Sequence, residues 1–130
     1  MKNLLPAVAV FAVSIASLSL GSVLLKIGMD RYGAQTAAGA SFLQALSKTP
    51  ELSAGVALML VQFAGTMALF KWGWDASVVI PVLGLSYVLT TALGKWMLNE
   101  PVSPLRWMGV LLIIAGVFCV ARSVGLAKIP

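Results

Sequence analysis

Four nearly uninterrupted apolar runs occupy most of this 130-residue sequence. They cover residues 4–25, 52–70, 78–97 and 105–120. A bilayer hydrocarbon core about 30 Å thick is crossed by about 20 apolar residues in helical form, and each run reaches or approaches that length with its flanks. Lipid offers no hydrogen-bond partner to a bare backbone, so such runs must be helical inside the membrane. The sequence therefore predicts an all-α membrane protein with four transmembrane helices.

The composition supports the same fold class. Hydrophobic residues make up 60% of the chain and charged residues only 10%, and the mean hydropathy is +0.99, far above that of an ordinary soluble domain. The net charge of +5 does not predict a nucleic-acid partner, because the basic residues lie mostly at the ends of apolar runs, where they anchor helices to anionic headgroups. Cys119 is the one cysteine and histidine is absent, so we expect no disulfide, no metal site and no cofactor.

The N-terminus shares features with a secretory signal peptide, since Lys2 precedes an apolar stretch that contains small residues. A signal peptide has an apolar region of about 7 to 15 residues, whereas the run at 4–25 continues past any plausible cleavage point. We therefore expect this run to be the first transmembrane helix.

Prolines and capping residues mark where the helices begin and end. Thr49 and Ser103 can cap helices whose first positions are Pro50 and Pro104, and Pro101 must end the third helix. The last two connections are short, so consecutive helices are predicted to be antiparallel neighbours. We expect one integral membrane domain, residues 1–130, with helices at about 3–28, 50–71, 77–99 and 104–122.

The first connection, from Met29 to Lys48, is longer than the others. Within it Phe42, Leu43 and Leu46 recur at helical spacing beside polar residues. A short helix lying in the membrane interface between the first and second helices fits this pattern. It could serve as a tether between two helix ends or as a lateral gate for lipid.

The distribution of basic residues gives little information on orientation. Excluding Lys26 and Lys95, which fall within helices, leaves a bias toward a cytoplasmic N-terminus; counting them leaves a difference of one charge. The first set is Lys2, Lys71, Arg122 and Lys128, and the second set is Lys26, Arg31, Lys48, Lys95 and Arg106.

Polar residues form rows on two of the predicted helices, and each set of rows ends in a lysine at the same membrane face. On the first helix the rows lead to Lys26, and on the third helix they lead to Lys95. Two cations at one mouth would attract an anionic headgroup such as a phosphate. The alternatives are that the hydroxyls serve helix packing and that the lysines reach out to the interface. The rows are Ser14, Ser17 and Gly21 beside Ser19, Ser22 and Lys26, and Ser86, Thr90 and Gly94 beside Tyr87, Thr91 and Lys95.

Gln62 is a further polar residue of the apolar runs, and acidic residues are missing from them. Gln62 lies one turn from Thr66 on the second helix, where it could add a neutral group to the same cavity or bond between helices. No carboxylate lies inside the four runs, so an acid for proton exchange is missing from the membrane interior. No phosphate-binding loop and no paired nucleophile and base occur, and we do not expect an enzyme.

An acid–proline hairpin precedes a glycine-rich last run. The stretch is NEPVSPLRWMG at residues 99–109, followed by VLLIIAGV at 110–117. Here the chain resembles the drug/metabolite transporter superfamily, the EamA and small multidrug resistance-like proteins. Gly109 and Gly116 look like the last-helix dimerisation stripe of the small multidrug resistance proteins, although they would serve packing within one chain equally well.

Within this superfamily the sequence is similar to the four-helix subunits of the aminoarabinose-phosphoundecaprenol flippase. The shared features are the Glu-Pro-Val-Ser-Pro hairpin, Pro81 near the start of the third helix, and a small-residue first helix ending in Lys26. The drug exporters have an essential glutamate at the position of Leu18, and its absence argues against exchange of drugs for protons.

The resemblance implies a multi-pass protein of the bacterial inner membrane that moves an undecaprenyl-phosphate-linked sugar, an amino sugar by this likeness. It also implies a homodimer, or a heterodimer with a paralogous four-helix subunit, surrounded by membrane lipids. Lys26 and Lys95 would receive the phosphate. The sugar would contact Tyr87 and Gln62, beside Ser86 and Thr90, and Glu100 would pair with a cationic group or fix the hairpin. The alternatives are a small-cation or drug exporter and a non-transporting subunit that stabilises a partner enzyme.

Overall fold

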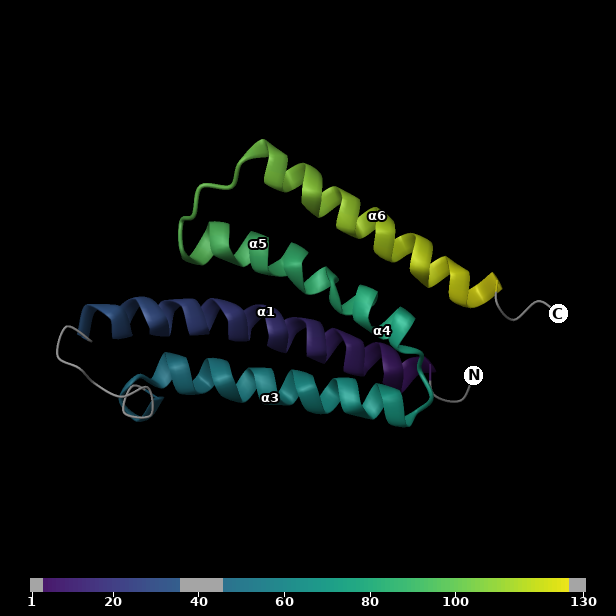
Figure 1. Ribbon diagram of the computed structural model, residues 1–130, viewed down its shortest axis with the longest axis horizontal. Coiled ribbons are helices and arrows are strands. Elements are labelled where there is room, and N and C mark those ends of the chain that lie inside the picture. Colours follow the sequence, from purple (N-terminus) through teal and green to yellow (C-terminus); the bar gives the residue numbers. More distant parts are fainter. Residues whose placement is uncertain (1–3, 36–45, 127–130) are drawn as a thin grey trace.

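The computed structural model describes residues 4–35 and 46–126, and within these ranges all regular structure is helical. Four segments are long and apolar enough to cross a membrane: α1, α3, α4 with α5, and α6. The fold prediction is therefore confirmed, and the chain is an all-α, multi-pass membrane protein. The helices are α1 (Leu4–Gln35), α3 (Pro50–Lys71), α4 (Ala76–Leu83), α5 (Leu85–Met97) and α6 (Pro104–Leu126) (Figure 1).

The first helix continues well past the expected end near residue 28. It contains 32 residues, which at 1.5 Å per residue make it about 48 Å long, more than the hydrocarbon core requires. Gly28, at the predicted end of this helix, lies inside α1 and faces Leu52 of α3. The last turns of α1 thereby carry charged residues beyond the apolar part of the bundle.

The third spanning segment is interrupted in its middle. Pro81 has no N–H to donate, and the regular helix breaks at Gly84, between α4 and α5. The Gly84 N–H donates to the carbonyls of Ile80 and Pro81, at 3.2 and 2.9 Å. The segment ends at Met97, before the hairpin that contains Pro101.

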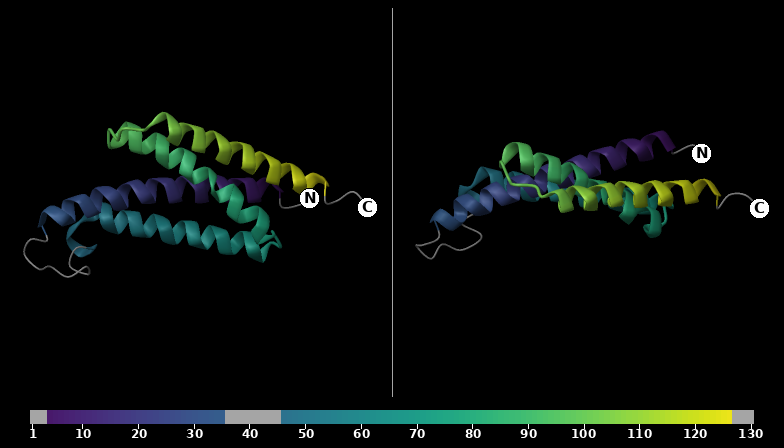
Figure 2. Two further views of the ribbon diagram at one scale, coloured as in Figure 1. Left: turned by 45° about the horizontal axis from the view of Figure 1, so that its top comes forward. Right: turned by 90° about the horizontal axis from the view of Figure 1, so that it is seen from above.

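The helix α1 is the centre of the arrangement. It packs against α3 along much of its length and against α5 on another side, while α6 contacts α4 and α5 (Figure 1). The α4–α5 segment passes obliquely across α1, as the two views of Figure 2 show. The observed order across the bundle is therefore α3, α1, α4 with α5, and α6.

Small residues bring α1 and α3 close together. A Cβ on Gly28 would lie 2.8 Å from the backbone nitrogen of Leu52, and one on Gly21 would lie 3.1 Å from the Gly55 carbonyl oxygen. Nearer the N-terminus Ser14 meets Gly65, again without room for a larger side chain. Ser14, Gly21 and Gly28 are seven residues apart along α1, so small residues recur on the face of α1 that meets α3.

Apolar side chains form a core at the end of the bundle where α1, α3 and α4 meet. Phe11 and Trp74 pack edge to face there, with ring centroids 5.6 Å apart and an interplanar angle of 86°. This end has a conventional core, and it leaves the charged residues concentrated at the other end. The buried residues of the core are Ala7, Leu69, Val79 and Leu83.

The expected interfacial helix is only partly covered by the structure. Residues 46–48, which include Leu46, are helical, whereas Phe42 and Leu43 lie outside the described residues.

Candidate functional site

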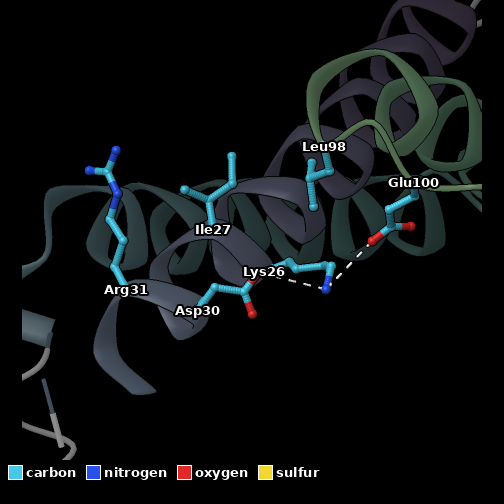
Figure 3. Close-up of a pocket in the computed structure, with 6 residues that line it drawn as sticks. All are labelled: Lys26, Ile27, Asp30, Arg31, Leu98 and Glu100. Carbon is cyan, nitrogen blue, oxygen red and sulfur yellow. Dashed lines mark ion pairs between the residues drawn. The ribbon is translucent and has the colours of Figure 1, made fainter. Parts of the chain in front are cut away.

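A hollow of about 300 Å³ lies at the end of the bundle where the last turns of α1 approach the turn that follows α5. Its lining combines two acidic, two basic and two apolar side chains (Figure 3). The open, charged character suits a polar group at a membrane surface and does not suit an acyl chain. The lining residues are Lys26, Ile27, Asp30, Arg31, Leu98 and Glu100.

Lys26 is the central charge of this hollow. Its Nζ lies 3.5 Å from Oε1 of Glu100 and 3.7 Å from Oδ2 of Asp30, one helical turn away on α1. Half of the Lys26 side chain is exposed, and the side chain of Glu100 is 35% exposed. Ion pairs this accessible to water contribute about 0 to 1 kcal/mol, so the lysine can exchange partners at little cost.

The turn between α5 and α6 determines the position of Glu100. Asn99 has a φ of 51°, in the left-handed region that asparagine tolerates better than most residues, and it reverses the chain after α5. The Glu100 N–H then donates to the Gly94 carbonyl at 3.3 Å. Gly94 also leaves space for the carboxylate, since a Cβ there would lie 3.3 Å from Oε2 of Glu100. The acid is thereby held beside α5 and faces Lys26.

Arg31 lies at the edge of the hollow and pairs with Glu51 in the first turn of α3. Glu51 is well placed there, because the N-terminal end of a helix dipole favours an acid. The pair ties the end of α1 to the start of α3. Lys26 is left facing two carboxylates, so this part of the hollow has one negative charge more than the lysine neutralises.

Lys95 occupies the same end of the bundle but does not line the hollow. Its Nζ lies 5.7 Å from the ring centroid of Trp107, which joins α5 to α6 by a cation–π contact. The two lysines therefore share a membrane face, and each has its own partner in the chain.

The other predicted sugar-binding residues lie away from the hollow. Tyr87 is 67% exposed, and Thr90 is half-buried one turn further along α5. Ser86 is buried, and its backbone carbonyl accepts a hydrogen bond from Ser19 of α1 at 3.1 Å. Gln62 donates to Thr66 of its own helix at 2.9 Å, and α3 lies on the other side of α1 from α5, which carries Tyr87 (Figure 1).

Asp30 and Arg31 are the charged lining residues that the sequence does not single out as site residues, and the apolar Ile27 and Leu98 are not singled out either. Asp30 and Arg31 fall in the predicted connection from Met29 to Lys48, because the first helix is predicted to end at about residue 28. The spacing of Lys26 and Asp30, four residues apart, is the pattern that would have indicated an ion pair on a longer helix.

Gly109 and Gly116 of α6 have open space beside them in the described part of the chain. A Cβ on either Gly109 or Gly116 would meet nothing within 4 Å. Large apolar side chains around them, including Leu112 and Phe118, are exposed. Among the described residues, these glycines are therefore not used for packing inside one chain.

Curated relatives of this sequence are named as probable 4-amino-4-deoxy-L-arabinose-phosphoundecaprenol flippase subunits ArnE. One from Pseudomonas savastanoi pv. phaseolicola is 44% identical over 49 residues, covering 38% of this chain and 43% of that protein. Others are from Sodalis glossinidius, 34% identical over 67 residues, and Pseudomonas fluorescens, 44% identical over 65 residues. These two matches cover 49% and 46% of this chain, and 60% and 57% of the relatives.

The similarity to these flippase subunits confirms the resemblance inferred from the hairpin and the last run. The matches span about half the length of the curated relatives. No protein-family profile matches the chain, and no solved structure gives a significant match. The relatives carry the name of a transporter and not of an enzyme.

Proposed function

We propose that this chain is a subunit of a flippase that moves an undecaprenyl-phosphate-linked amino sugar across the bacterial inner membrane. The similarity to proteins named as subunits of such a flippase supports the substrate class. The four membrane-spanning segments and the charged hollow at one end of them fit a protein that handles a lipid with a polar head.

The position of Lys26 is the observation that carries this proposal. A lysine at the end of an apolar helix, exposed in a hollow and held only by accessible ion pairs, is available to a lipid phosphate. Lys95 adds a second cation at the same membrane face and would engage the phosphate after leaving Trp107. Glu100 would pair with a cationic group.

In this proposal the sugar meets further polar groups while it passes between helices. Tyr87 presents its side chain on the exposed side of α5, where a passing headgroup can reach it. The sugar-contacting residues would be Tyr87, Gln62, Ser86 and Thr90.

A second subunit would complete the path. One chain gives only four spanning segments, and α6 has an open glycine face that packs against nothing described in its own chain. Gly109 and Gly116 would receive the helix of a second copy or of a paralogous four-helix subunit, because small residues let backbones approach in lipid. The headgroup could then cross the membrane between the helices of two subunits.

The test is mass spectrometry of the lipid that copurifies with the protein from inner membranes. Wild-type protein should retain an undecaprenyl-phosphate amino sugar, and the Lys26→Gln, Lys95→Gln double variant should lose it. Arginine at both positions should retain part of it, because the expected role is electrostatic. Arg122→Gln removes an exposed cation at the other end of the bundle and serves as the matched control. An unchanged amount of copurified lipid in the double variant would contradict the assignment of Lys26 and Lys95 to phosphate binding.

The drug exporter makes a different prediction about protons. Leu18 is half-buried in α1, at the position where those exporters have their exchange acid, and it cannot carry a proton. Proteoliposomes with a pH-sensitive dye should therefore show no proton entry driven by export of a hydrophobic cation. Coupled proton entry that Glu100→Gln abolishes would favour the exporter.

A further inference from the structure

The charged hollow contains an ammonium group between two carboxylates, and this arrangement indicates what a substrate could place there. Resting on the proposed function, we propose that Glu100 and Asp30 bind a primary ammonium of the headgroup in exchange for Lys26, whose own ammonium moves to the headgroup phosphate. The hollow would thus select lipids that carry both a phosphate and a primary amine.

The geometry of the resident lysine is the first argument. Its Nζ lies 3.5 Å from Glu100 and 3.7 Å from Asp30, so the two acids already hold an ammonium between elements far apart in the sequence (Figure 3). A sugar amine carries the same charge and the same hydrogen-bond donors as a lysine side chain. It can therefore occupy the same position.

The charge balance is the second argument. A lipid with a phosphate alone would draw Lys26 away and leave two carboxylates facing each other without a cation, which is unfavourable. A headgroup that also carries an ammonium replaces the lost charge at the moment the lysine leaves. Arg31 is already paired with Glu51 at the start of α3 and is not free to take that role.

Glu100 is held in place by more contacts than Lys26. Glu100 is held by the turn at Asn99, by the bond from its N–H to the Gly94 carbonyl, and by the space that Gly94 leaves. Lys26 has a long, flexible and half-exposed side chain. Movement of the lysine is therefore easier than movement of the carboxylate.

The lining of the hollow also suits a sugar. Ile27 and Leu98 contribute apolar surface beside the charges, and the volume is about 300 Å³. The apolar face of a sugar ring can pack against such side chains while its amine and phosphate meet the charged ones.

The experiment measures binding of defined lipids to the full chain in nanodiscs by native mass spectrometry. The lipids are undecaprenyl-phosphate 4-amino-4-deoxy-arabinose, its N-acetylated form, and undecaprenyl phosphate, with phosphatidylethanolamine as a phospholipid that also carries an amine. Wild-type protein should bind the amino lipid about tenfold more tightly than the N-acetylated lipid, the size of one charge-assisted contact. Glu100→Gln should reduce that preference to less than about threefold, and Asp30→Asn should shift it in the same direction.

Asp75→Asn is the matched control, because Asp75 is an exposed acid at the opposite end of the bundle. Asp30 is exposed on α1, so its substitution tests the idea even where Glu100→Gln disturbs the hairpin. Equal binding of the amino and N-acetylated lipids by wild-type protein would overturn the inference and leave phosphate recognition intact. A loss in Glu100→Gln that is the same for all lipids would also overturn it.

The phospholipid comparison separates this inference from the proposed function. Polyprenyl lipids that bind no better than phosphatidylethanolamine would contradict the proposed function. If phosphatidylethanolamine binding then depends on Glu100, the ammonium site is supported and its ligand is a phospholipid.

Discussion

Glycines lie along both the α1–α3 contact and α6, but their surroundings are opposite. At Gly28 and Gly55 an added Cβ would come within 3 Å of backbone atoms on the facing helix. At Gly109 and Gly116 it would meet nothing within 4 Å in the described chain. The same residue type therefore closes a contact in one region and leaves a surface open in the other.

This difference separates the molecule into two working parts. The α1–α3 pair is a closely packed frame that carries Lys26 toward its end. The hairpin of α5 and α6 carries Glu100 to that lysine, and its outer helix has a face without a partner among the described residues. The candidate site lies at the junction of the two parts.

The largest expected effect is on the frame. Gly28→Ala places a methyl group against the backbone of Leu52, which cannot rotate away, so we expect a loss of about 1 to 3 kcal/mol in the free energy of unfolding. Gly109→Ala meets open space and should be neutral or slightly stabilising, because alanine favours helix. Denaturation in mixed micelles followed by circular dichroism measures both. Equal losses in the two variants would show that Gly28 and Gly109 do not differ in how closely they are packed.

The next effect concerns the open face. Leucine at both Gly109 and Gly116 should fill the strip where a second backbone approaches, and it should reduce disulfide crosslinking in membranes through Cys119, which is exposed on the same helix. Gly33→Leu, a glycine of α1 that also has open space around it, is the control. If crosslinking of the double variant matches wild type while folding is intact, the dimer interface lies elsewhere.

A smaller effect is expected where the two parts meet in the membrane. Ser19 donates to the Ile15 carbonyl of its own helix at 2.8 Å and to the Ser86 carbonyl of α5 at 3.1 Å. Ser19→Ala should cost about 0.6 kcal/mol in the free energy of unfolding, typical of a hydrogen bond between helices in a membrane. Ser22 donates to Leu18 of its own helix at 2.7 Å, so Ser22→Ala should cost less in the same denaturation assay. A larger loss in Ser22→Ala would show that the contact from Ser19 to α5 does not stabilise the fold.

The sequence predicts those parts of the fold that depend on a single local feature. Length and hydropathy were sufficient for the spanning segments, and the prolines at 50 and 104 stand at the first positions of α3 and α6. The structural roles of Gly28 and Gly84 are harder to predict, because a glycine can end a helix, interrupt it or let a neighbouring helix approach closely. Which of these applies depends on the facing helix, and the local sequence does not contain that information.

Only some residues of the candidate site could be predicted from the sequence, for the same reason. Lys26 and Glu100 each stood out, since one ends a polar row and the other precedes a proline. Their pairing depends on the turn at Asn99 and on the length of α1, both of which are properties of the folded chain. Asp30 was missed because it lies on the part of α1 that exceeds the expected helix.

Movement of the amino lipid between leaflets tests most directly whether this chain is part of a flippase. Proteoliposomes with the chain, alone or coexpressed with a second four-helix subunit, would contain undecaprenyl-phosphate 4-amino-4-deoxy-arabinose and receive a membrane-impermeant, amine-reactive reagent. With wild-type protein, we expect labelling to exceed the half of the lipid that lies in the outer leaflet and to approach completion. With Lys26→Gln, labelling should stop near half, as in liposomes without protein. Labelling that stops near half with wild-type protein in both preparations would contradict the claim that this chain moves the lipid.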